Sequence, residues 1–289
     1  MAPSTPGGGW DVLARTIADT LKSTGREKEV EVYNVGGKAG TLGLADFVKL
    51  KGQPNKLMVT GFVMVAGIPV NNSPYLLSRD TTPIAGLVSA NEVLLVPVNS
   101  RFKTVDDLLS TLKATPGAVK FGGSSLGGTS HVAFATLAQE LNIPVKSMQY
   151  VPSAGGLQAA KAMLTGAVDV VSTGYSEVDE LIRGGSVRVL AVLAESRLPG
   201  VNAPTLMEKG VNVNVANWRG VVAPAGISAL EKTRLELQMQ RLVKSTVWQI
   251  TLKQNKWDDR YMGANEFKRF IQYQENQLPK LLKSLDLIQ

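Results

Sequence analysis

The chain has 289 residues, of which 44% are hydrophobic and 19% charged, and its net charge of +7 comes from scattered basic residues. This is the composition of a folded globular protein, and without basic blocks or apolar runs of ~20 residues we expect neither a nucleic-acid partner nor a membrane span. With no cysteine and one histidine, we expect no disulfide, no thiol nucleophile, no metal site and no cofactor.

The first feature along the chain is a glycine loop that begins at Gly7. A strand should precede such a loop, and Met1 to Thr5 barely supplies one. We therefore expect that a native N-terminal segment, with an export signal, is missing before Met1.

Strand-like and helix-like runs then alternate along almost the whole chain. The predicted strands are short, rich in Val, Leu and Ile, and bounded by Gly, Pro or Asn: Glu29–Val35, Leu57–Val63, Ile84–Ala90, Val93–Val98, Val119–Gly122, Val168–Ser172 and Val187–Leu193. Helical periodicity separates them, and a long helix is predicted from Asn265 onward. The alternation predicts an α/β protein with mostly parallel sheets flanked by helices on both faces.

Two apolar runs suggest that the chain forms two lobes. Glu92–Val98 precedes a new helix start, and Trp218–Ala223 does the same much later. We interpret both as hinge strands that join the lobes. The predicted lobe 1 is discontinuous, with residues 1–98 and 222–289, and lobe 2 has residues 99–221.

Three loops share the order strand, small residues, helix: Pro6–Asp11, Gly36–Thr41 and Gly122–Ser130, with a weaker fourth at Pro152–Gly156. The first turn of a helix leaves backbone N–H groups without partners and carries a partial positive charge. Glycine lets a ligand approach that backbone closely. Such loops therefore predict an anion site facing the cleft, although glycines also serve simple turns.

The third loop also matches two enzyme motifs in part. A Walker A motif would need a lysine where Gly128 stands, so nucleotide hydrolysis is not expected. Gly123-Ser124-Ser125-Leu126-Gly127 is formally a nucleophile elbow, which makes a serine hydrolase using Ser125 the alternative function. Its base would have to be His131, which lies too close in sequence to reach Ser125 in triad geometry.

Several side chains near the loops have more than one possible role. Trp10 either packs on a ligand or belongs to the core, and His131 either lines the cleft or is structural. Asp11 would repel an anion, so we expect it to hold the loop, cap the helix or accept from a ligand hydroxyl. Lys38 and Arg219 would each suit a ligand carboxylate, but for both a solvated position is the first expectation.

The order of these motifs resembles the substrate-binding receptors of tripartite tricarboxylate transporters, the Bug receptors. The resemblance starts with Pro3-Ser4-Thr5-Pro6-Gly7-Gly8-Gly9-Trp10-Asp11 and Asn34-x-x-Gly37-x-x-Gly40, continues with Gly122-Gly123-Ser124-Ser125, and includes Trp218-x-Gly220-x-x-Ala223-Pro224. It spans essentially the whole chain. Lys38 departs from the small residues usual at its position.

The resemblance implies a periplasmic, monomeric receptor with the Venus-flytrap fold of periplasmic binding proteins, not an enzyme. Its partners would be a small carboxylate, such as citrate or a dicarboxylate, and integral-membrane permease subunits. The ligand-binding residues that we predict in the two lobes are Pro6, Gly7, Gly8, Gly9, Trp10, Asp11, Gly37, Lys38, Ala39, Gly40, Thr41, Phe62, Ser124, Ser125, Gly128, Thr129, His131, Ser153, Thr173 and Tyr175.

Overall fold

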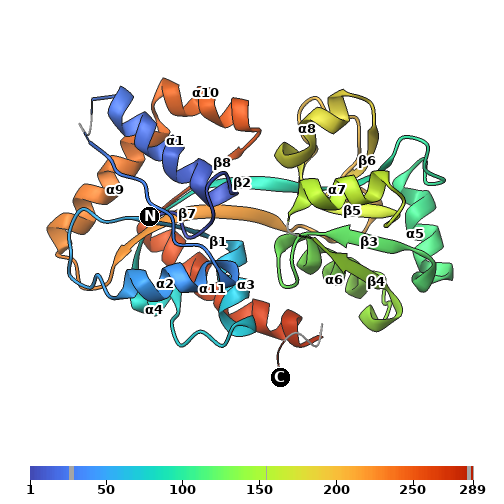
Figure 1. Cartoon of the computed structure of the whole chain (residues 1–289), viewed down its shortest axis with the longest axis horizontal. Coiled ribbons are helices and arrows are strands. Elements are labelled where there is room, and N and C mark those ends of the chain that lie inside the picture. The colour runs from blue at the N-terminus through green and yellow to red at the C-terminus, as the bar shows by residue number, and fades with distance from the viewer. Residues whose placement is uncertain (26–28, 154, 285–287, 289) are drawn as a thin grey trace. The chain divides into compact units, whose positions relative to one another are not determined.

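The computed structural model of the chain (Figure 1) describes residues 1–25, 29–153, 155–284 and 288. The chain divides into two compact units: unit 1 comprises Met1–Ser89 and Trp218–Lys280, and unit 2 comprises Ala90–Asn217 and residues 281–289. The chain leaves unit 1 within one strand and returns within another. The boundaries predicted after residues 98 and 221 fall just past the first of these strands and inside the second.

Unit 1 is built from both ends of the sequence. Its N-terminal part contains α1 (Gly9–Ser23), a 3₁₀ turn (Lys38–Gly40), α2 (Thr41–Val48), β1 (Met58–Gly61), α3 (Phe62–Val70), α4 (Leu77–Asp80) and the first half of β2 (Thr81–Pro97). Its C-terminal part contains most of β7 (Ala216–Pro224), then α9 (Ala229–Val243), α10 (Thr246–Asn255), β8 (Asp258–Gly263) and most of α11 (Ala264–Ser284). The core contains large side chains from several of these helices, among them Leu13, Phe47, Trp248 and Phe267.

Unit 2 contains the middle of the sequence. After the second half of β2 come α5 (Val105–Ala114), a 3₁₀ turn (Pro116–Ala118), β3 (Lys120–Gly123), α6 (Thr129–Glu140), a 3₁₀ turn (Val145–Ser147), β4 (Gln149–Pro152), α7 (Gly156–Leu164), β5 (Val170–Gly174), α8 (Tyr175–Arg183), β6 (Val187–Val192) and a 3₁₀ turn (Met207–Lys209). Three strand-to-helix steps therefore follow one another: β3 to α6, β4 to α7 and β5 to α8.

The α/β class is confirmed, but the sheets are mixed rather than mostly parallel. In unit 1, β1 is antiparallel to β7, and β8 is antiparallel to the first half of β2. In unit 2, the second half of β2 is antiparallel to β5 and β6, whereas β3 is parallel to both β4 and β5. The prediction was wrong on direction because continuous apolar runs report burial of both strand faces, not the direction of the neighbouring strands.

Side-chain alternation along the strands of unit 2 places helices on both faces of its sheet. Val171 of β5 packs in one cluster with Ala159 and Met163 of α7. Phe121 of β3 faces the other way, and its ring lies 5.3 Å from that of Phe134 in α6. Because β3, β4 and β5 run parallel, their carboxyl ends share one sheet edge, where α6, α7 and α8 begin.

The strand predicted at Glu29–Val35 is wrong. This segment is extended, and the described residues show only an isolated parallel bridge between Asn34 and Ala2. The Ala2 N–H donates to the Tyr33 carbonyl, and the Val35 N–H donates to the Ala2 carbonyl. A strand needs a partner that continues the ladder, and the described residues give this segment only that one bridge.

Candidate functional site

Helix starts fall into two groups that differ in how their first turn is capped. The side chains of Thr104, Ser228 and Ser245 accept a backbone N–H at the starts of α5, α9 and α10. In contrast, α1, α2, α3, α6, α7 and α8 begin after glycine N-caps, and the described residues give none of these caps a side-chain hydrogen bond. The Thr41 N–H of α2 and the Gly156 N–H of α7 already donate to the Lys38 carbonyl and to Glu177. The other first-turn N–H groups of this second group are of the kind that an anion can use.

In unit 1, the starts of α2 and α3 meet at the indole of Trp10, which lies in the first turn of α1. A Cβ added at Gly40 would lie 2.6 Å from Trp10 Cζ3 and 2.9 Å from Met64 Cε. A Cβ at Gly61, the N-cap of α3, would lie 3.0 Å from Trp10 Nε1. Only glycine permits this approach, so three helix starts surround one buried indole. Phe62, the first residue of α3, is also buried.

Asp11 holds the first loop in place. Its carboxylate accepts from the Gly7 N–H at 2.8 Å, from Asn34 Nδ2 at 2.9 Å and from Arg15 Nε at 3.0 Å. The Arg15 bond is the main cause that lowers the pKa of Asp11 to about 2, and the bonds from Gly7 and Asn34 add to it. With these acceptor positions engaged, Asp11 positions the loop that contains Pro6 and Gly8.

The second loop follows a strained backbone path. Gly37, Lys38, Ala39 and Gly40 all have positive φ, and two of these residues are not glycine. Such strain persists only where the surroundings impose it, which is frequent at functional sites. Ala39 packs so closely on α3 that a Cβ at Gly67 would lie 2.5 Å from it. The Lys38 side chain is exposed as expected, whereas Thr41 is buried and its hydroxyl donates to the Lys38 carbonyl.

Arg219 is the residue of unit 1 that sequence reasoning placed wrongly. It is 8% exposed rather than solvated, and its Nη1 donates to the Gly9 carbonyl at 3.4 Å. A Cβ at Gly9 would lie 2.6 Å from its Nη2, so the missing side chain of Gly9 gives the guanidinium its room. The first loop is thus paired with a buried positive charge. An arginine inside a strand of apolar neighbours was the available signal.

In unit 2, the third loop and α6 enclose His131. Its Nδ1 accepts from the Gly127 N–H at 3.1 Å, and its ring stacks on Tyr150 with centroids 4.3 Å apart. Burial lowers the pKa of His131 to about 4, so the ring is neutral at pH 7. The Tyr150 hydroxyl donates to the Ser124 carbonyl at 2.8 Å, which fixes the loop above it.

This arrangement does not assemble a hydrolase. Ser125 is exposed, and its carbonyl accepts from the Gly128 N–H. His131 Nδ1 is already engaged by Gly127, and among the described residues no hydrogen bond joins His131 to Ser125. The geometry therefore lacks the nucleophile–base contact on which the hydrolase alternative depends.

Hydroxyl groups gather where α6, α7 and α8 begin. Thr129 and Thr173 are 2% and 1% exposed, and within the described part of the chain their hydroxyls have no hydrogen-bond partner. Thr173 lies directly against Gly156, whose N–H donates to Glu177. Buried unpaired hydroxyls are uncommon in proteins, so these two are candidates for ligand contact. Ser153 directly follows β4, and Tyr175 is the first residue of α8.

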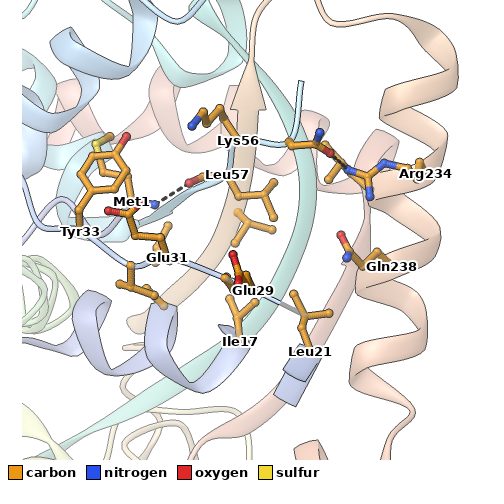
Figure 2. A pocket seen from close by; sticks show the side chains of 17 residues that line it. Met1, Ile17, Leu21, Glu29, Glu31, Tyr33, Lys56, Leu57, Arg234 and Gln238 are labelled. Carbon is orange, nitrogen blue, oxygen red and sulfur yellow. Dashed lines mark hydrogen bonds between the residues drawn. The ribbon is translucent and has the colours of Figure 1, made fainter. Parts of the chain in front are cut away.

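A cavity lies elsewhere in unit 1, as Figure 2 shows. It measures about 440 Å³ and is lined by side chains of α1 and α9 and by the segments 29–33 and 55–57. The Met1 amino group donates to the Leu57 carbonyl at its edge. No predicted site residue lines it. The described residues also contain no cluster of metal ligands and no helix long and apolar enough to cross a membrane.

Residues 15–287 match the family described as tripartite tricarboxylate transporter family receptor. The chain belongs to this family. Family membership confirms the resemblance seen in the sequence and the prediction that the protein is a receptor and not an enzyme.

Individual proteins agree with this assignment. The receptor is 29% identical over 248 residues to the UPF0065 protein in the tcbD-tcbE intergenic region of Pseudomonas sp. (strain P51), covering 84% of the receptor and 72% of that protein. Its fold is that of MatC from Rhodopseudomonas palustris with bound malate, with a TM-score of 0.78, 21% identity and 97% of each chain covered. A second R. palustris protein, solved with adipate, gives a TM-score of 0.83 and 22% identity, covering 98% of the receptor and 95% of that chain.

Proposed function

We propose that the receptor binds a small di- or tricarboxylate, such as malate, adipate or citrate. We further propose that it works in the periplasm as a monomer and passes this ligand to the permease subunits of a tripartite transporter. The observation that carries the proposal is the set of glycine-capped helix starts, which accompanies Trp10 and Arg219 in unit 1 and unpaired hydroxyls in unit 2.

The available donors are strong enough for such a ligand. A hydrogen bond to a charged group contributes about 1.5–3 kcal/mol net, and micromolar affinity needs about 8 kcal/mol. Four to six such bonds therefore suffice, even after the cost of ordering the ligand. Two solved proteins of the same fold bind malate and adipate, which are carboxylates of the size that we propose.

Calorimetry and thermal shift with malate, adipate and citrate test the proposal, with the matching neutral esters as controls. We expect binding of at least one acid and none of its ester. Gly9→Ala should weaken that binding at least tenfold while the fold is retained, because the new Cβ displaces the Arg219 guanidinium. Gly263→Ala is the matched control, since a Cβ at Gly263 meets nothing within 4 Å.

Two outcomes would contradict the carboxylate site. One is the absence of any thermal shift for all three acids. The other is unchanged affinity in Gly9→Ala, which would place the anion away from the first loop. Delivery has its own measurement: uptake of the labelled acid by vesicles containing the permease should depend on added receptor.

A further inference from the structure

Glu92 is a buried acid that directly precedes an apolar run of the sequence. It lies in β2 just before Val93–Val96, and it is 2% exposed. Its Oε2 accepts from Ser130 Oγ at 3.1 Å and from Ser172 Oγ at 2.9 Å. Ser172 belongs to β5 and Ser130 to α6, so the carboxylate lies among the elements that carry the candidate residues of unit 2.

The network continues from Glu92 to the third glycine loop. Ser124 Oγ lies 3.2 Å from Ser130 Oγ and forms a hydrogen bond with it. Ser130 is buried, whereas Ser124 is half-buried at the end of β3. Gly128 allows this arrangement, because a Cβ there would lie 2.6 Å from Ser124 Oγ. A chain of hydroxyls therefore runs from the buried carboxylate to a more accessible serine.

Counting the hydroxyl protons shows which group donates in each of these hydrogen bonds. An ionised carboxylate only accepts hydrogen bonds, and each serine hydroxyl has one proton to donate. Ser130 uses its proton on Glu92, so Ser124 must donate to Ser130. The hydroxyl proton of Ser124 is then engaged, and its remaining lone pairs can only accept. While Glu92 is ionised, Ser124 presents an acceptor to whatever reaches the loop.

We propose that Glu92 is a positioning residue that makes Ser124 a hydrogen-bond acceptor and so selects carboxylates that carry a hydroxyl group. This inference rests on the proposed function and narrows its ligand class. The carboxylate oxygens of the ligand meet the free donors, namely the helix-start N–H groups and the hydroxyls of Thr129 and Thr173. The ligand hydroxyl donates to Ser124, where a carboxylate oxygen would be repelled.

Pairs of acids that differ by one hydroxyl test this selection: malate and succinate, citrate and tricarballylate, 2-hydroxyadipate and adipate. For any pair that binds, we expect the wild type to bind the hydroxy acid about fivefold more tightly, as expected for one net hydrogen bond. Glu92→Gln frees the hydroxyl chain to reverse, because an amide both donates and accepts. In this variant the two acids of a pair should then bind with about equal affinity.

Two further variants keep the test decisive. Ser124→Ala removes the acceptor without touching the buried carboxylate, so it should weaken the hydroxy acid more than its partner acid and so lower the preference. Glu275→Gln is the control, since Glu275 is a half-buried carboxylate that accepts from the Ser78 N–H, but it lies in unit 1. It should keep the wild-type preference.

The possible failures are distinguishable. If the wild type binds none of the six acids, the carboxylate proposal itself fails, and the hydroxyl selection fails with it. If it binds both members of a pair equally, only the role of Glu92 is refuted. A preference that survives in both Glu92→Gln and Ser124→Ala also overturns it, because another group must then read the hydroxyl.

Discussion

Replacing Gly40 with alanine should destabilise the second loop in two ways, by backbone strain and by steric overlap. Gly40 has φ of 85°, and alanine in the left-handed region costs about 1–2 kcal/mol. The new Cβ would also lie 2.6 Å from Trp10 Cζ3 and 2.9 Å from Met64 Cε. Overpacking of this kind costs about 1–3 kcal/mol. The free energy of unfolding should therefore fall by about 2–5 kcal/mol.

Gly52→Ala is the matched control for the backbone cost. Gly52 has φ of 78°, close to that of Gly40, and a Cβ there meets nothing within 4 Å. It should lose only about 1–2 kcal/mol. Urea titration followed by tryptophan fluorescence measures both variants, and calorimetry with the preferred acid measures binding.

The difference between the two variants isolates the contact with Trp10. We expect Gly40→Ala to weaken ligand binding as well, because the indole that joins three helix starts must move. Gly52→Ala should bind as the wild type does. Equal losses of stability in both variants, or full affinity in Gly40→Ala, would refute the convergence of the loops on Trp10.

Three further predictions concern protonation and capping. Because the folded pKa of His131 is about 4, below the ordinary value of 6.5, the unfolded chain binds more protons between these values. The free energy of unfolding should therefore fall as pH drops from 6.5 to 4, by at most about 1.4 kcal/mol per pH unit for this group, and His131→Gln should flatten that slope in urea titrations. Asp11→Asn should lower the free energy of unfolding by about 1.5–3 kcal/mol at pH 7. The control Asp46→Asn, at an exposed carboxylate, should lower it by less than about 1 kcal/mol. Because the pKa of Asp11 is lowered to about 2, the stability advantage of the wild type over Asp11→Asn should vanish as pH falls from 4 toward 2. Ser245→Ala should lower the free energy of unfolding by about 1 kcal/mol, because α10 loses its helix cap, and it should leave ligand affinity unchanged. Weakened binding in this variant would show that the capped helix starts also contribute to the site.

Local patterns predicted the helices and the loops well. The four-residue spacing of Leu13, Ile17 and Leu21 identifies α1, and these side chains are buried as the spacing requires. The glycine loops before α1 and α6 lie at helix starts as predicted. Both features depend on short stretches of sequence, where propensity and capping chemistry act directly.

Pairing between distant segments was less accessible. The strands β4 and β8 were missed, because Gln149–Pro152 and Asp258–Gly263 are short and partly polar, and β8 exists only through its pairing with β2. The converse error occurred at Glu29–Val35, which has the composition of a strand but no continuing ladder. Strand formation depends on a partner that a single segment of sequence does not reveal.

Two charged residues whose burial was not predicted have the same feature in the sequence. Arg219 and Glu92 each stand in or beside an apolar strand, and both are buried. Isolated burial of a charge is prohibitive, so polar groups from elsewhere in the fold must converge on such a residue. Here the Gly9 carbonyl meets the arginine, and serine hydroxyls meet the glutamate. Glycine loops indicate where backbone donors are available. A charge in or beside an apolar strand indicates where the fold has assembled a polar network. We expect this network to determine which chemical groups a ligand can present at the site.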